Sequence, residues 1–183
     1  MKKLVMIAAM MLMSIGAFAE EGTKSVGINA GYANYGDGYK PFGLGIKFQY
    51  EFIDDWRAEV AYNYWFPKDK AGVMDFNLDI QYLFSLTENL NFYPMAGFTL
   101  GMTHGQTIKE AFGGQESIPG FNVGCGVEYM LTPELKINAD VKYESCSKTK
   151  SITYDDGFGK ISAFDWKLKY DGPVIQVGIS YIF

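Results

Sequence analysis

Strict alternation of apolar residues with small or polar residues is the feature that most constrains this chain. Beyond Glu21 it recurs in eight stretches, and no window there has a period near 3.6 residues. The stretches are 24–34, 42–52, 56–66, 73–84, 90–103, 120–131, 135–145 and 173–183. A period of two indicates β-strands with two different faces. Most stretches have about the 9–11 residues that a tilted strand needs to cross a bilayer.

The connections between these stretches alternate in length. The short ones are 53–55, 85–89 and 132–134, and the mostly longer ones are 35–41, 67–72, 103–119 and 146–172. Short turns at one end, long loops at the other and an even strand number are typical of outer-membrane barrels. The sequence therefore predicts an all-β fold, an eight-stranded antiparallel up-and-down transmembrane β-barrel. Pro94 is expected to remove one ladder hydrogen bond from its strand.

Side-chain volume decides which face of the strands lies outside. One face carries large apolar residues such as Ile28, Leu44 and Phe98, and the other carries glycines with charged and amide residues. The interior of an eight-stranded barrel is only wide enough to be filled by side chains. The bulky face must therefore contact lipid, which argues against a lipocalin-like secreted barrel with an apolar pocket. Aromatic residues at both ends of this face predict two interfacial girdles.

Charged residues recur on the inward face, with seven acids against four bases. They are Lys47, Glu51, Arg57, Glu59, Asp75, Asp79, Glu128, Lys136, Asp140, Lys142 and Glu144. Arg57, the one arginine, and Glu51 are placed symmetrically about the Asp54 turn, which predicts a bidentate cross-strand ion pair. Glu128 and Lys136 are similarly placed about Thr132. We favour an ion network that fills a closed barrel, and the acid excess leaves a cation-preferring conduit or a proton-sensitive gate as the alternative.

The N-terminus and the composition limit the location and the partners. A basic start, an apolar run from Leu4 to Met13 and the small residues Ala17 and Ala19 indicate a secretory signal peptide over 1–19, which leaves 20–183 as the barrel domain. Sixteen Lys and Arg residues against 21 Asp and Glu residues, with no basic run, argue against nucleic-acid binding.

The chemistry-bearing residues do not form a catalytic site in the sequence. His104 is the only possible imidazole base, and Gln106 stands where a serine would share its face. The glycine pairs in 43–45 and 124–126 lie inside strands, and 155–160 is typical of a turn, where a weak calcium contact stays open. We expect no enzyme activity, no metal and no cofactor, with a lipid-modifying outer-membrane enzyme as the enzymatic alternative.

The two cysteines are expected to remain unbonded. Reflection of Cys125 through the 132–134 turn places it opposite about Val141 and not opposite Cys146. The alternation also directs Cys125 to lipid and Cys146 to the lumen.

The longest connection, 146–172, is the main candidate for recognition. Residues 151–154 and 161–170 alternate, and 155–157 is a turn signal, so the last two strands are expected to continue above the membrane as a hairpin. A bulge at 171–173 is expected to reset the alternation. One face of the second arm carries Phe164, Trp166, Leu168 and Tyr170. The candidate contacts for a ligand are Phe164, Trp166 and Tyr170. The hairpin is either a lid over the barrel or an exposed edge that binds a partner.

The last eight residues carry the most specific family signal. Residues 176–183 hold a polar residue, Gly178, Tyr181 and a terminal Phe183, and this resembles the last strand of the small outer-membrane barrels of the OmpX and OmpA-transmembrane type. The chain also resembles the porin-like outer-membrane β-barrel domain family of Bacteroidetes. The resemblance implies an integral outer-membrane location among phospholipid and lipopolysaccharide, and assembly by the barrel-assembly machinery. It implies a non-enzymatic structural or surface-interaction role, with a narrow porin-like passive channel as the alternative.

Overall fold

The computed structural model describes residues 22–36, 39–68, 71–105, 117–155 and 161–183, so the predicted signal peptide lies outside the described residues. These residues form nine strand segments. They are β1 (Lys24–Ala33), β2 (Phe42–Ile53), β3 (Trp56–Lys68), β4 (Ala71–Tyr82), β5 (Phe84–Ser85), β6 (Leu90–Gly105), β7 (Ser117–Thr132), β8 (Leu135–Asp155) and β9 (Ile161–Ile182). No helix in the described ranges has the length and hydropathy to cross a membrane.

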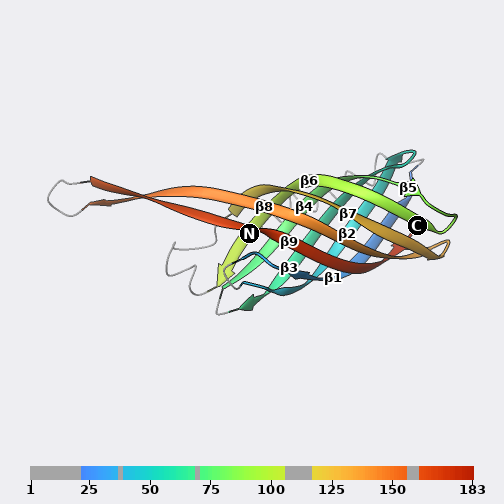
Figure 1. Cartoon of the computed structure of the whole chain (residues 1–183), viewed down its shortest axis with the longest axis horizontal. Coiled ribbons are helices and arrows are strands. Elements are labelled where there is room, and N and C mark those ends of the chain that lie inside the picture. Colours follow the sequence, from blue (N-terminus) through green and yellow to red (C-terminus); the bar gives the residue numbers. More distant parts are fainter. Residues whose placement is uncertain (1–21, 37–38, 69–70, 106–116, 156–160) are drawn as a thin grey trace.

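The strands close into a barrel in which every paired neighbour is antiparallel. The order is β4-β3-β2-β1-β9-β8-β7-β6-β5, and pairing of β4 with β6 completes the cylinder (Figure 1). β5 continues β4, because both pair with β6 in one register. The prediction of an eight-stranded antiparallel barrel is confirmed.

Pro94 explains why β4 and β5 are separate segments. The Leu86 amide donates to the Leu90 carbonyl, and the Met130 amide donates to the Asn89 carbonyl. Even-numbered residues of β6 therefore form their backbone hydrogen bonds with β4 and β5, and odd-numbered residues form them with β7. The register places Pro94 opposite Tyr82, where β4 ends. Because proline has no N–H, the ladder is interrupted at this point.

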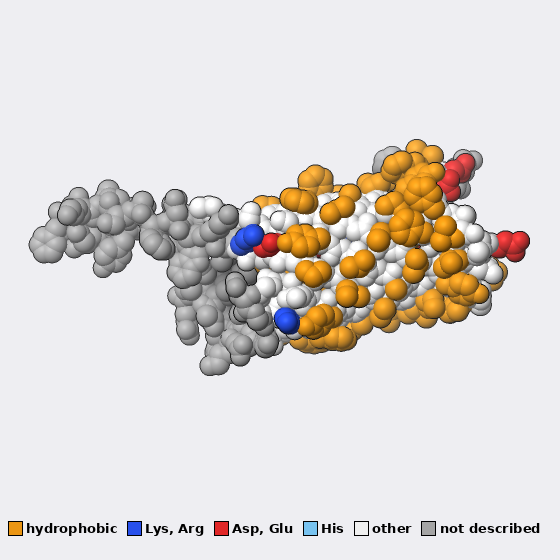
Figure 2. All heavy atoms as spheres, in the orientation of Figure 1, with side chains coloured by type: hydrophobic (Ala, Val, Ile, Leu, Met, Phe, Trp, Pro, Cys, Tyr) orange, Lys and Arg blue, Asp and Glu red, His pale blue; other side chains and the backbone are white. Residues whose placement is uncertain are grey.

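The outer wall is apolar, and the charged residues visible on it lie near its two ends (Figure 2). Large side chains remain exposed there, such as Phe98 at 74% and Ile28 at 62%. Trp56, Tyr82 and Phe84 form a run of edge-to-face ring contacts near the short turns, with centroids 5.1 and 4.6 Å apart. Aromatic residues prefer the membrane interface, so this run marks one edge of the lipid-facing band.

β8 and β9 continue past the point at which their neighbours end. Their pairing is unbroken from Leu135 opposite Tyr181 to Asp155 opposite Ile161. Pairing of β8 with β7 stops at Cys146, and pairing of β9 with β1 stops at Val174. We call the projecting part, residues 147–155 and 161–171, the ribbon (Figure 1).

The expected bulge at 171–173 is wrong. Ser145, Glu144 and Tyr143 each pair with one residue of 171–173, so no extra residue is present to shift the alternation. Tyr170 therefore stays on the inward face, where it is only 6% exposed. The side chains of Phe164, Trp166 and Leu168 lie outside the described part of the structure.

Both cysteine predictions are confirmed for the described chain. Cys125 pairs with Val141 across the β7–β8 ladder, and the two thiols are free. Cys125 is half-buried at a lipid-facing position, whereas Cys146 is fully buried at the barrel mouth.

We predict that a water-soluble maleimide labels neither cysteine of the barrel folded in lipid vesicles and labels both after unfolding in urea. The unlabelled chain should have the mass of the fully reduced protein. A loss of about 2 Da that maps to Cys125 and Cys146 would show a disulfide and contradict the register.

Candidate functional site

The buried guanidinium of Arg57 organises the lumen near the short turns. Arg57 is completely buried, and its Nη1 lies 2.7 Å from Glu128 Oε2 on β7. Its Nε donates to Gln81 Oε1 at 2.7 Å, and its guanidinium carbon lies 5.0 Å from the centre of the Tyr93 ring. Lys136 Nζ lies 3.2 Å from the same Glu128 oxygen.

The principal partner of Arg57 differs from the sequence prediction. Glu51 does pair with Arg57 in the β2–β3 register, but its Oε1 is 3.8 Å from Nη1, and its side chain is 28% exposed. The short contact is with Glu128 on β7, and this contact spans the lumen from Arg57 on β3. The predicted bidentate pair is therefore replaced by a shared cluster around Arg57.

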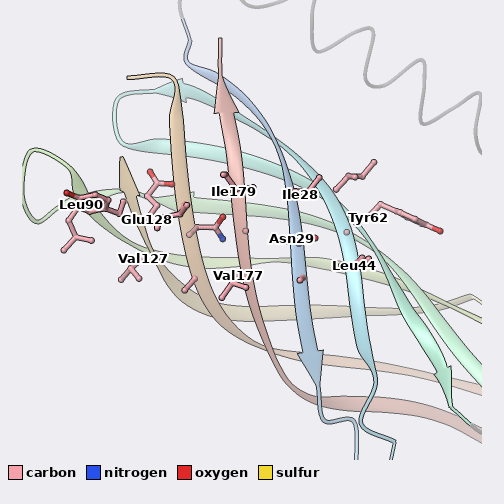
Figure 3. Close-up of a pocket in the computed structure, with 17 residues that line it drawn as sticks. Ile28, Asn29, Leu44, Tyr62, Leu90, Val127, Glu128, Val177 and Ile179 are labelled. Carbon is pink, nitrogen blue, oxygen red and sulfur yellow. The ribbon is translucent and has the colours of Figure 1, made fainter. Parts of the chain in front are cut away.

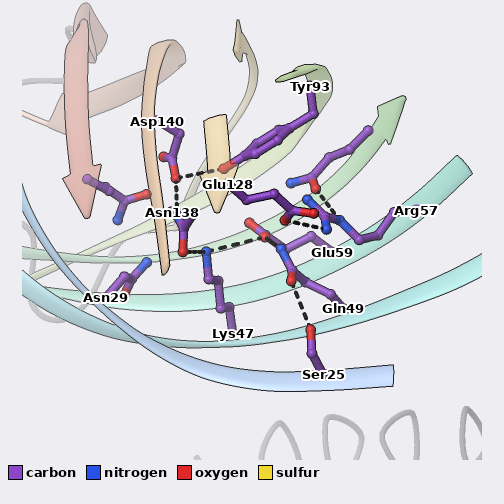
Figure 4. A network of polar contacts seen from close by, with 12 residues as sticks. Ser25, Asn29, Lys47, Gln49, Arg57, Glu59, Tyr93, Glu128, Asn138 and Asp140 are labelled. Carbon is purple, nitrogen blue, oxygen red and sulfur yellow. Dashed lines mark hydrogen bonds and ion pairs between the residues drawn. The ribbon is translucent and has the colours of Figure 1, made fainter. Parts of the chain in front are cut away.

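A second set of contacts fills the middle of the lumen. Ser25 donates to Gln49 at 2.9 Å, and Gln49 Nε2 donates to Glu59 at 2.6 Å. Lys47 Nζ donates to Asn138 Oδ1 at 2.8 Å and lies 3.8 Å from Glu59. Figure 4 shows these residues reaching the same space from β1, β2, β3 and β8. Asn138 also donates to Asp140 at 2.8 Å.

An amide-rich layer lies between this set and the long loops. Asp75 accepts from Asn63 at 2.7 Å, from Asn77 at 2.6 Å and from the indole N–H of Trp65. Asn122 donates to Asp79 at 2.7 Å. Sequence reasoning selected the two carboxylates and missed the amides, although their inward parity and their spacing along the strands were visible.

Lys142 and Glu144 connect this layer to the barrel mouth. Lys142 Nζ lies 3.0 Å from Glu144 Oε1, and both side chains are buried. The Tyr35 hydroxyl donates to the other Glu144 oxygen at 2.8 Å. The charged interior is thus tied directly to the aromatic residues above it.

Aromatic and aliphatic side chains close the mouth of the barrel. We call this cluster the plug, and its members are Ala33, Tyr35, Trp65, Val73, Ile118, Cys146, Tyr170 and Val174. The Tyr35 ring makes edge contacts with Tyr170 at 4.9 Å and with Trp65 at 6.1 Å. Tyr170 reaches across to β6, where a Cβ at Gly101 would collide with its ring, and Gly43 leaves the same kind of space for Trp65.

The wall outside this lumen is suited to lipid. Ile28, Leu44 and Val177 are more than half exposed and border an apolar hollow on β1, β2 and β9 (Figure 3). Asn29 and Glu128 alternate with such residues and have buried side chains that bond inside the barrel. One face of each strand therefore contacts lipid, and the other face lies in the polar lumen.

The other sequence candidates do not gather into a reactive site in the described structure. His104 pairs with Gly72 along the β4–β6 backbone, and its side chain lies outside the described residues, as does 156–160. Within the described ranges no group of three His, Cys, Asp or Glu residues is arranged to hold a metal ion.

A closed antiparallel barrel with a polar interior and an apolar outer band defines an integral outer-membrane protein. The model of the outer membrane protein beta-barrel domain family matches residues 5–183, and the chain belongs to this family. The attachment invasion locus protein of Yersinia pseudotuberculosis is 28% identical over 174 residues, which are 84% of this chain and 92% of that protein.

Solved structures share the fold. Neisserial surface protein A has a TM-score of 0.62 at 18% identity, over 88% of this chain and 97% of that one. OprG of Pseudomonas aeruginosa has a TM-score of 0.57 at 19% identity, over 88% and 95%. Ail, the attachment invasion locus protein of Yersinia pestis, has a TM-score of 0.52 at 19% identity, over 88% and 97%.

We predict that Arg57→Ala lowers the free energy of unfolding by about 3–5 kcal/mol, because it leaves Glu128 buried beside one remaining cation. Urea unfolding of the barrel in lipid vesicles measures this loss. Glu51→Gln is the matched control, and we expect a cost below about 1 kcal/mol because Glu51 is partly exposed and more distant. Equal losses for the two variants would contradict the assignment of Glu128 as the main partner.

Proposed function

We propose that this chain is a non-enzymatic, non-conducting outer-membrane protein that recognises an extracellular ligand through the ribbon. The observation that carries the proposal is the continuation of β8 and β9, fully paired, beyond a barrel mouth that the plug closes. Recognition in barrels of this kind belongs to loops on a rigid scaffold. The ribbon projects from the rigid barrel in the position of such a loop.

The filled lumen supports a scaffold role and argues against a conducting pore. Arg57, Lys47, Asp75 and Glu144 lie at successive positions between the short turns and the mouth, and each is at least 96% buried. Arg57 contacts Glu128 on β7 and Lys47 contacts Asn138 on β8, in both cases across the lumen. Asp75 and Glu144 accept hydrogen bonds from Asn63 and Tyr35. A solute would have to break these contacts in turn, and eight strands leave little further width.

The relatives support an attachment role. One relative is named for attachment and invasion, and the Yersinia pestis protein has been solved with the heparin analogue sucrose octasulfate. By sequence, the ribbon of the present chain holds four lysines, at positions 148, 150, 167 and 169. We propose a polyanionic or acidic extracellular ligand for the ribbon on this basis.

The lipid and assembly partners are also proposals. Tyr181 and Phe183 are exposed on the outer wall at the end of β9, at 53% and 63%, and Gly178 faces inward. This strand pairs with β1, so the first and last strands are neighbours in the barrel, which suits a terminal signal for the barrel-assembly machinery. Lipopolysaccharide is the proposed neighbour of the wall nearest the long loops.

Deletion of residues 149–169 tests the role of the ribbon. The register leaves Ser147 and Lys148 as a short connection between Cys146 and Tyr170, so the barrel and the plug should remain intact. We predict that bacteria displaying the shortened chain lose adhesion to surfaces coated with heparin or extracellular-matrix protein. Heat-modifiable migration on gels is the control for folding.

A narrow passive channel is the second candidate. It is favoured by the excess of acids in the lumen and by Asp79 Oδ2 and Asn122 Oδ1, which are buried without a hydrogen-bond partner among the described residues. Increased conductance of the shortened chain in planar bilayers, with unchanged adhesion, would support a lid over a channel and contradict the proposed binding role.

A further inference from the structure

The charges inside the barrel are distributed unevenly along its axis. From the short turns to the middle of the lumen, the described inward residues include three bases and four acids: Lys47, Arg57, Lys136, Glu51, Glu59, Glu128 and Asp140. Between this part and the plug, the described inward charges are one base, Lys142, and three acids. The acids are Asp75, Asp79 and Glu144, and all four side chains are buried. One positive charge against three negative charges leaves this upper lumen with a balance of −2.

Asp79 is the least compensated of the three acids. Asp75 accepts three hydrogen bonds from neighbouring side chains, and Glu144 lies 3.0 Å from Lys142. Asp79 accepts a hydrogen bond from Asn122 at 2.7 Å through Oδ1. Its Oδ2 is buried without a hydrogen-bond partner among the described residues. A carboxylate removed from water in this way requires a counter-charge or further donors.

A glycine keeps space open beside Asp79. Gly97 on β6 pairs with Asp79 on β4 and with Asn122 on β7, so Asn122 reaches Asp79 across the inner face of β6. A Cβ at residue 97 would collide with Asp79 Oδ1. The absence of a side chain at this position therefore allows the two polar groups to meet.

The groups around this space are rich in oxygen. Asn122 Oδ1 is also buried without a hydrogen-bond partner among the described residues. Asn122 Nδ2 lies 3.0 Å from Thr99 Oγ1 and 3.4 Å from Asn77 Oδ1, and Thr99 donates to Asn77 at 2.6 Å. Carboxylate, amide and hydroxyl oxygens are the ligands that hard cations prefer. Because this set has a single carboxylate, it suits a monovalent cation better than calcium or magnesium.

We propose that Asp79 Oδ2 and Asn122 Oδ1 bind a monovalent cation, sodium or potassium, that is enclosed in the lumen. The plug closes the mouth above this site, and the cluster around Arg57 fills the lumen below it. A water molecule would satisfy both free oxygens but would leave the negative balance of the upper lumen unchanged. The inference concerns the scaffold and is independent of the role proposed for the ribbon.

Urea unfolding of the full barrel in vesicles of zwitterionic lipid tests the proposal at neutral pH. Sodium chloride or potassium chloride is raised at constant ionic strength against N-methylglucamine chloride, whose cation is too large for the site. The folded barrel binds the ion and the unfolded chain does not. The equilibrium constant of unfolding should therefore fall about tenfold for each tenfold rise in the bound cation above its Kd.

Three variants locate the site. Asp79→Asn keeps the shape of the side chain and removes its charge, so the dependence on sodium or potassium should disappear. Asn122→Ala removes one ligand and should shift the dependence to a concentration about tenfold higher or more. Asp140→Asn is the matched control, because it neutralises an inward carboxylate that bonds to Asn138 outside the site, and it should keep the dependence.

A direct measurement on the native chain stands beside the variants, since Asp79→Asn may not fold. Crystals of the barrel grown in rubidium chloride should give an anomalous difference peak between Asp79 and Asn122. Absence of this peak, together with equal stability in the three salts, would overturn the inference.

Two further results would also overturn it, and both leave the proposed function intact. Stability that ignores the salt but rises as the pH falls, with this rise lost in Asp79→Asn, would show that Asp79 holds a proton in place of a cation. Stability that depends on neither the salt nor the pH would show that water alone completes the site.

Discussion

The bilayer requires that each backbone N–H and C=O group inside it find a partner within the protein. For a chain of short alternating segments, a closed antiparallel cylinder meets this requirement, and the pairing of β4 with β6 completes it. Closure of the barrel then determines the surroundings of both faces of each strand. One face of each strand contacts lipid, and the other enters a space that only side chains can fill.

Filling this space with polar groups has a cost that the contacts offset. Arg57, Glu128 and Lys136 are almost completely removed from solvent, so each depends on the others for its stability. The contact of Arg57 with Glu128 joins β3 to β7, which are not neighbours in the sheet. Such contacts hold the cylinder in one cross-section, and the plug holds its mouth in the same way through Tyr35 and Tyr170.

The fold was predictable because it depends on local periodicity. A period of two located the strands, and reflection through a short turn placed Cys125 opposite Val141. Reflection could not find the main partner of Arg57, since it relates only strands that a turn connects. The amide layer around Asp75 was within reach of the same reasoning, because Asn63 lies opposite Asp75 in the β3–β4 register and Asn77 lies two residues along the same strand.

The ribbon shows a second limit of sequence analysis. Alternation predicted two arms and a turn, and both arms are strands in the structure. The assumed bulge at 171–173 was wrong because glycine and proline signal an irregularity without requiring an extra residue. Which residues of β8 bond to β9 depends on the hydrogen-bond phase of this ladder, and the sequence does not contain that phase.

The central claim is that the barrel is a scaffold and that the ribbon carries recognition. Transfer of residues 147–171 onto a designed transmembrane β-barrel tests it most directly, with adhesion to heparin-coated and matrix-coated surfaces as the measurement. We predict that the grafted barrel gains adhesion that the designed barrel lacks. A correctly folded graft that does not adhere, beside a native chain that does, would contradict the claim.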